Sequence, residues 1–184
     1  MNCVGFGYRQ GMPDERAIIP IQTLLVVAVD GSHNAVRAGF GFYSSENLFG
    51  FGPCDVSEPA EFVAVIRALD AVPVNRPVLF LSDSEEVGLR LGDGVPPRVR
   101  NANRDMILAA MERVATRPVT FERVRQDVEV VPLHAVAHYL SFLGRQGLAG
   151  APGVRVSNVD AILDAPDANR FAHHLVHQHL FPPR

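Results

Sequence analysis

Three acidic residues occupy positions that suit a metal-dependent hydrolase. Asp30 closes the apolar run of residues 24–29, Asp83 closes a second apolar run at residues 77–82, and Glu61 stands near the start of a helical pattern. A carboxylate at the end of a buried strand loses hydration on folding, so a cation or hydrogen-bond donors must replace that water. We therefore expect the three carboxylates to share a cation.

Apolar spacing predicts the elements that must position these acids. Residues 22–30 are expected to form a buried strand and residues 37–44 and 47–52 two further strands of an antiparallel meander, in which Gly39 and Gly41 permit close backbone approach. The later elements are expected at residues 58–71 (helix), 77–82 (strand), 84–91 (helix), 103–114 (helix), 119–124 (strand) and 132–145 (helix). A helix between two strands implies parallel pairing, which makes the two aspartates neighbours.

Composition narrows the class of protein. The 184 residues, 47% of them hydrophobic, suffice for one main domain with an appendage, and no apolar run approaches the ~18 residues of a membrane span. The first residues lack the layout of a signal peptide. Cys3 and Cys54 form no CxxC pair, so neither a disulfide framework nor a cysteine zinc site is indicated. We expect a cytoplasmic protein without a membrane partner.

Positive charge is concentrated in one stretch. The net charge of −3 argues against attraction of phosphates over the whole surface. Between Arg98 and Arg125, however, seven arginines accompany only three acids. This stretch is interpreted either as a solvated helix face with ion pairs or as a nucleic-acid contact.

The order of elements and three local strings resemble the ribonuclease H family. Asp-Gly-Ser at residues 30–32 is similar to the family's strand-end motif, residues 60–69 to its glutamate-bearing helix, and Ser-Asp-Ser at residues 82–84 to its second aspartate motif. The similarity spans about residues 22–145. It implies an α/β fold with a mixed five-stranded sheet, an antiparallel meander followed by parallel strands, flanked by helices.

The resemblance implies a chemistry and a set of site residues. Hydrolysis of a phosphodiester by two divalent ions uses one to activate water and one to stabilise the leaving oxygen. Asp30 would bridge two Mg²⁺ or Mn²⁺ ions, and Glu61 and Asp83 would bind one each, because hard oxygen ligands suit both metals. The expected substrate contacts are Gly31, Ser32, Ser84 and Arg125.

Some positions depart from the family pattern. The fourth catalytic carboxylate falls at His138, or at His134 if the register shifts by one turn, and histidine can ligate a metal or move a proton. A loop histidine of the family falls near Asp127, which cannot do the same proton transfer at neutral pH. Amides that usually contact substrate are replaced by Ser57, Glu58 and Glu85.

The two ends of the chain are predicted to lie outside the domain. Residues 1–20 are expected to be an extension, residues 21–146 the ribonuclease-H-like domain, and residues 147–184 a flexible joint with a helical tail. His173 and His177 in the tail have a spacing that can bind a transition metal. The favoured interpretation is an amphipathic helix, with Phe171, Leu175 and Leu180, that docks on the domain, on a second copy to form a homodimer, or on a protein partner.

The sequence predicts an endonuclease that hydrolyses the RNA strand of RNA–DNA hybrids, with Asp30, Glu61, Asp83 and His138 as catalytic residues. The alternative is a module that kept the fold, lost efficient catalysis and binds nucleic acid or protein. Cleavage of single- or double-stranded RNA also stays open, because fold alone does not fix function.

Overall fold

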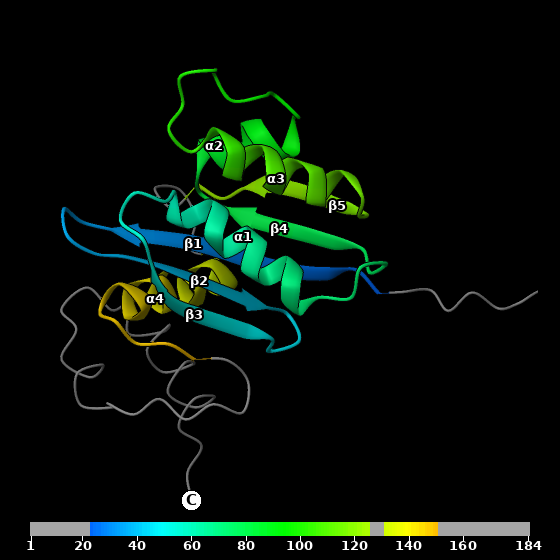
Figure 1. The fold of residues 1–184 in the computed structure, drawn as a ribbon. Coiled ribbons are helices and arrows are strands. Elements are labelled where there is room, and N and C mark those ends of the chain that lie inside the picture. Colours follow the sequence, from blue (N-terminus) through cyan, green and yellow to red (C-terminus); the bar gives the residue numbers. More distant parts are fainter. Residues whose placement is uncertain (1–22, 126–130, 151–184) are drawn as a thin grey trace, which may run out of the picture.

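Five strands form a single mixed sheet with the spatial order β3-β2-β1-β4-β5 (Figure 1). The computed structural model describes residues 23–125 and 131–150. The strands are β1 (Leu25–His33), β2 (Ala38–Ser44), β3 (Phe49–Cys54), β4 (Val78–Ser82) and β5 (Val119–Arg123). The pairs β1–β2 and β2–β3 are antiparallel, and β1–β4 and β4–β5 are parallel. The predicted meander and the predicted parallel crossover are both confirmed.

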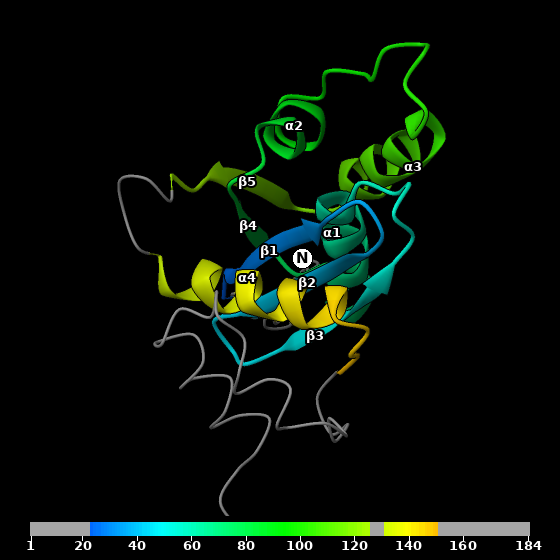
Figure 2. The same ribbon diagram turned by 90° about the vertical axis from the view of Figure 1, so that its left-hand side faces the viewer.

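Helices cover both faces of this sheet. They are α1 (Ala60–Ala71), α2 (Glu85–Val87) with the π-helical turn η1 (Gly88–Gly92), α3 (Arg104–Ala115) and α4 (Pro132–Arg145). In Figure 2, α1 and α3 lie together on one side, where Phe62 and Ile107 join Val27 in the largest core cluster. On the opposite face, Ala137 of α4 packs with Ala28. Among the described helices none is long and apolar enough to cross a membrane.

The first strand ends three residues later than the sequence suggests, and this changes the setting of Asp30. The prediction that Asp30 ends its strand is wrong, because β1 continues to His33 while β2 pairs along it. Asp30 lies opposite Gly41 within the ladder, whereas Asp83 directly follows the end of β4 as predicted. Asp30 is therefore held by its pairing with β2, whereas Asp83 lies just after the last residue of β4.

Glycines let α4 lie directly on β2. A Cβ atom at Gly41 would come within 2.4 Å of the Ser141 nitrogen, and one at Gly39 within 2.0 Å of the Arg145 nitrogen. Gly144 of α4 approaches the backbone of Gly52 in the same way. Since the obstructing atoms belong to backbone, no rotamer change could relieve the overlap. The predicted close approach is confirmed, and the element that makes it is α4.

The chain returns to the sheet after α4. Gly150 forms an isolated antiparallel bridge with Phe51 of β3, and Leu148 packs against the cluster between β3 and α4. This contact covers part of an edge strand whose backbone groups need partners. The proposed extension at residues 1–20 and the histidines of the proposed tail lie outside the described residues.

The close approach of α4 can be tested by adding one methyl group. Gly41→Ala should destabilise the protein by about 1–3 kcal/mol or more, because the helix must move away from the sheet. Gly88→Ala is the matched control, since a Cβ there meets nothing within 4 Å. In that helical turn alanine should stabilise by about 0.5–1 kcal/mol. Urea denaturation measures both, and equal effects of the two substitutions would contradict the packing described here.

Candidate metal centre

Asp30 is a buried acid that faces α4. Only 3% of the residue is exposed. Its pairing partner Gly41 points to the same face of the sheet and touches the backbone of Ala137 and Ser141. The carboxylate of Asp30 therefore lies beneath the helix, where protein groups must replace its lost hydration.

The two oxygens of Asp30 have different surroundings. Oδ2 accepts a hydrogen bond of 2.5 Å from the Ser141 hydroxyl and lies 3.2 Å from His138 Nδ1. Ser141 Oγ also lies 2.8 Å from the His138 carbonyl oxygen. The hydroxyl has one proton to donate, and the charged carboxylate is the stronger acceptor. Oδ1 faces another way and lies 4.0 Å from His134 Nε2. One oxygen is thus held by donors and the other is directed at a second group.

That second group contains Asp83 and His134. The parallel register pairs Ala28 with Leu81, which puts Asp83 level with Asp30 two residues later. His134 Nε2 lies 3.5 Å from Asp83 Oδ1, and the His134 side chain is only 2% exposed. A hydrogen bond from His134 is the largest cause that lowers the pKa of the Asp83 carboxyl, against an opposing effect of burial. Ligand atoms of Asp30, Asp83 and His134 all lie within 4.8 Å of one another.

Glu61 stands beside this group. It lies in the first turn of α1, and a Cβ at Gly31 would come within 2.4 Å of the Glu61 nitrogen. Glycine at position 31 is therefore required for β1 and α1 to approach. Burial raises the pKa of the Glu61 carboxyl, with smaller contributions from the charges of Asp30 and Asp83. Glu61 shares their electrostatic field, but the described group within 4.8 Å does not include it.

His138 occupies the outer side of Asp30. Its side chain is 50% exposed, and the hydrogen bond to Asp30 is the largest cause that raises the pKa of its imidazole. The sequence left open whether His138 or His134 takes the fourth position. The structure places both near Asp30, with His134 at the Oδ1 side and His138 at the Oδ2 side.

The predicted substrate contacts occupy different places. Gly31 and Ser32 lie in β1 beside the site, partly exposed. The Ser84 hydroxyl accepts a hydrogen bond from the Val87 nitrogen and caps α2. Arg125 is exposed beyond β5. Asp127 lies outside the described residues.

The positions that replace family amides form local contacts instead. The Glu58 carboxylate accepts a hydrogen bond from the Asp55 nitrogen, and Ser57 donates to the Asp55 carboxylate. Both residues therefore stabilise the turn that precedes α1.

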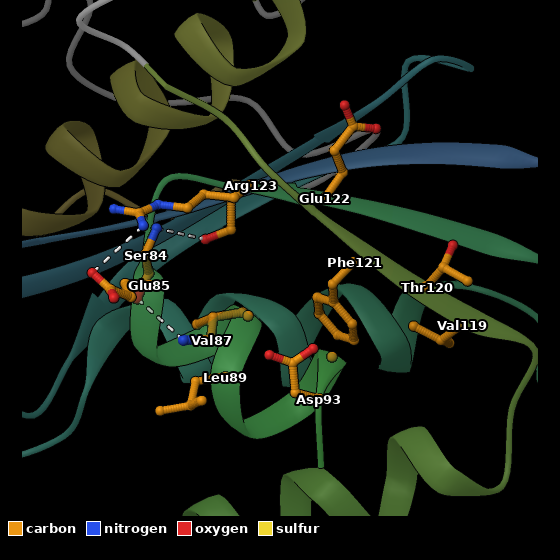
Figure 3. Close-up of a pocket in the computed structure, with 13 residues that line it drawn as sticks. Ser84, Glu85, Val87, Leu89, Asp93, Val119, Thr120, Phe121, Glu122 and Arg123 are labelled. Atoms are coloured by element: carbon orange, nitrogen blue, oxygen red, sulfur yellow. Dashed lines mark hydrogen bonds and ion pairs between the residues drawn. The ribbon is translucent and has the colours of Figure 1, made fainter. Parts of the chain in front are cut away.

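A groove of about 530 Å³ begins next to Asp83. Figure 3 shows it between β5 and the α2–η1 segment, with Arg123 and Glu85 directed toward each other near Ser84. Arg123 Nη1 lies 3.5 Å from Glu85 Oε2. Phe121 and Asp93 line the groove farther from the site. The groove thus holds one arginine, Arg123, against three acids, Glu85, Asp93 and Glu122.

The donor set fits a divalent cation. Two carboxylate oxygens and one imidazole nitrogen converge, and two of the three residues are almost fully buried. Ligand atoms bonded at about 2.0–2.2 Å to one ion lie roughly 3–4 Å apart, which is the range of the contacts around His134. Asp30 and Asp83 were predicted as ligands, and His134 was named only as a second choice.

Sequence analysis missed Ser141. A signal was available, because positions 134, 138 and 141 follow the i, i+4, i+7 spacing that places residues on one helix face. The serine was overlooked because it is a common residue that lies one turn beyond the expected carboxylate position.

Sequence comparison alone finds no relative: no protein-family model and no curated protein matches the chain. Solved structures do match. The ribonuclease H1 of the halophilic archaeon Halobacterium salinarum is similar over 66% of this chain and 97% of its own, with a TM-score of 0.54 and 18% identity.

Two further structures agree with this match. The N-terminal ribonuclease H domain of a Mycobacterium tuberculosis protein gives a TM-score of 0.53 at 14% identity, over 67% of this chain and 94% of its own. A ribonuclease H1 isolated from compost gives a TM-score of 0.52 at 18% identity, over 66% of this chain and 95% of its own. The chain has a ribonuclease-H-like fold, and at these identities the likeness concerns the fold.

The Ser141 hydroxyl should stabilise the folded protein through Asp30. Ser141→Ala is expected to lower the free energy of unfolding by about 1.5–3 kcal/mol, the range for hydrogen bonds to charged groups. Thr116→Ala, which removes an exposed hydroxyl bonded to the Arg113 carbonyl, should cost less than about 1 kcal/mol. Denaturant titration compares the two, and a Ser141 effect no larger than the control would contradict the assigned bond.

The pKa of His138 should depend on Asp30. An NMR titration of the imidazole should give a pKa above the ordinary value of about 6.5 in the wild type and a lower one in Asp30→Asn. Because the folded pKa is raised, the stabilisation is present below about pH 6.5 and is lost as pH rises through the folded value. Glu112→Gln, on an exposed part of α3, should leave the pKa unchanged. An identical pKa in wild type and Asp30→Asn would refute the coupling.

Proposed function

We propose, from the ribonuclease-H-like fold and the buried group at its centre, that this protein is a metal-dependent endonuclease that hydrolyses the RNA strand of RNA–DNA hybrids. The observation that supports this most is the convergence of Asp30, Asp83 and His134 at the end of the β1–β4 pair. The two carboxylates repel each other, and a bound cation would relieve that repulsion. The similar structures bear the name ribonuclease H, which supplies the substrate class.

The proposed ligands are Asp30 and Asp83, with Glu61 at the edge of the site. Mg²⁺ or Mn²⁺ are the proposed cofactors, two in the complete reaction, as in the family that the fold resembles. Such ions, when bound, lower the pKa of water and stabilise the leaving oxygen. Asp30 is preorganised for its role because Ser141 and His138 hold one of its oxygens and fix the direction of the other.

The proposed proton-transferring residue is His138. Its ring is half-exposed beside the site, and Asp30 raises the pKa of the imidazole from a value already near neutrality. An imidazole that exchanges protons near neutral pH is suited to general acid–base work. Nδ1 is directed at Asp30, so Nε2 is the atom available for exchange with water or substrate.

The proposed nucleic-acid contacts extend from the site toward β5. Ser84 and Arg123 line the groove next to Asp83, and Arg98, Arg100 and Arg125 are exposed in the arginine-rich stretch. Phosphates of a bound strand would be attracted to the three exposed arginines, because within the groove Arg123 is outnumbered by Glu85, Asp93 and Glu122. The close approach of Gly31 to α1 leaves the backbone beside the metal group without a side chain.

A second candidate function is a nucleic-acid-binding or protein-interaction module with weak catalysis. It is favoured by Glu85, which offsets the charge of Arg123 within the groove, and by the histidines at the position of a fourth carboxylate. The two candidates differ in one measurable property, because only the enzyme cleaves.

The test is cleavage of an end-labelled RNA–DNA hybrid beside single-stranded and duplex RNA, each in Mg²⁺ and in Mn²⁺. We expect hybrid cleavage that falls by at least about 100-fold in Asp30→Asn, since one preorganised charged group at a reacting centre is worth about 10²–10³. Glu112→Gln should retain the wild-type rate. Circular dichroism shows whether each variant is folded.

The outcomes separate the candidates. Cleavage of plain RNA with the same dependence on Asp30 would keep the enzyme and change its substrate. Binding of the hybrid without cleavage in either metal would refute the enzyme and leave the module.

A further inference from the structure

Resting on the proposed function, we infer that the protein without nucleic acid binds one transition-metal ion, Mn²⁺ in preference to Mg²⁺, with His134 Nε2 as a ligand beside Asp30 Oδ1 and Asp83 Oδ1. The resemblance to ribonuclease H implies oxygen ligands alone and two ions. The inference follows from three features of this chain: the kind of donor, its position, and the state of the second oxygen of Asp30.

The kind of donor decides the metal class. Mg²⁺ takes oxygen ligands and keeps several waters, whereas imidazole nitrogen suits first-row transition metals. Two carboxylates with one imidazole form a mixed N,O set, and Mn²⁺ accepts both kinds of donor. His134 therefore shifts the preference of the site away from Mg²⁺.

The position of His134 makes it a ligand candidate rather than a neighbour. Its Nε2 lies 3.5 Å from Asp83 Oδ1 and 4.0 Å from Asp30 Oδ1, and the three ligand atoms fit around one ion. The side chain is 2% exposed and belongs to α4, whose backbone packs directly against Gly41 of β2. A buried ring directed between two carboxylates is preorganised.

The second oxygen of Asp30 limits the number of ions. Ser141 Oγ and His138 Nδ1 occupy Oδ2 at 2.5 and 3.2 Å, so Asp30 presents a single oxygen to the group. An aspartate can bridge two ions with one oxygen for each ion, and at Asp30 this arrangement is blocked because donors already hold Oδ2. Glu61 does not join the described group within 4.8 Å. Among the described residues the group therefore offers ligands for one ion, and a second ion would need further ligands, such as those of the substrate.

The experiment uses the full 184-residue chain with Mn²⁺ and Mg²⁺ as probes. Mn²⁺ binding is followed by electron paramagnetic resonance, Mg²⁺ binding by competition, and nitrogen ligation by electron spin echo modulation from ¹⁴N. His134→Gln places an oxygen donor at similar reach without a change of formal charge. His33→Gln is the matched control, the same substitution at an exposed histidine at the end of β1, outside the metal group.

The wild type should bind Mn²⁺ at least about tenfold more tightly than Mg²⁺, with ¹⁴N modulation. His134→Gln should lose the modulation and most of this preference, while His33→Gln should retain both. Asp30→Asn should remove one Mn²⁺ site per chain. If His134→Gln does not fold, the ¹⁴N signal should persist in the double variant His173→Gln/His177→Gln, because these tail histidines are the other pair whose spacing can bind a transition metal.

Three results would overturn the inference: a wild type without ¹⁴N modulation, a preference for Mn²⁺ unchanged in folded His134→Gln, or loss of two sites in Asp30→Asn. Its failure differs from failure of the proposed function. Hybrid cleavage with oxygen-only ligation would refute the inference and keep the nuclease. Nitrogen-ligated Mn²⁺ without cleavage of any substrate would do the reverse.

Discussion

The contact between α4 and β2 is the constraint on which the site depends. Gly39 and Gly41 have no side chains to separate the helix from the strand, and the backbone of α4 fills the space that a Cβ would need. This brings residues one and two turns apart on α4 directly over Asp30. The same packing buries the carboxylate, so the helix that removes its water also supplies the donors that replace it.

Burial of Asp30 gives its two oxygens different chemistry. Ser141 and His138 serve Oδ2, while Oδ1 is directed at His134 and Asp83. A carboxylate exposed on a loop could rotate and exchange these surroundings, but one held in a strand under a helix cannot. The proposed nuclease and the proposed single-ion site both follow from this asymmetry.

The residues around Asp30 are not determined by the fold. Solved structures at 14–18% identity are similar to this chain in fold, so very different sequences reach it. The choice of donors around Asp30 is not fixed by the fold. In this chain the donors include the histidines of α4, and Arg123 pairs with Glu85 beside the groove. The proposed metal and substrate preferences rest on these residues.

The sequence by itself determined the parts of the structure that repeat along the chain. Apolar periodicity located the strands and helices, and α4 matches its predicted bounds of 132–145, because burial of one face imposes a regular spacing. The helix between two strands also predicted the parallel pairing of β1 and β4, and with it that Asp30 and Asp83 are neighbours. Three features became clear only in the tertiary structure. β1 ends at His33, His134 lies on the Oδ1 side of Asp30, and Ser141 donates to Oδ2. These depend on how far and at what rotation α4 lies over β2, a distance set by contacts between residues about 100 positions apart, which local spacing does not encode.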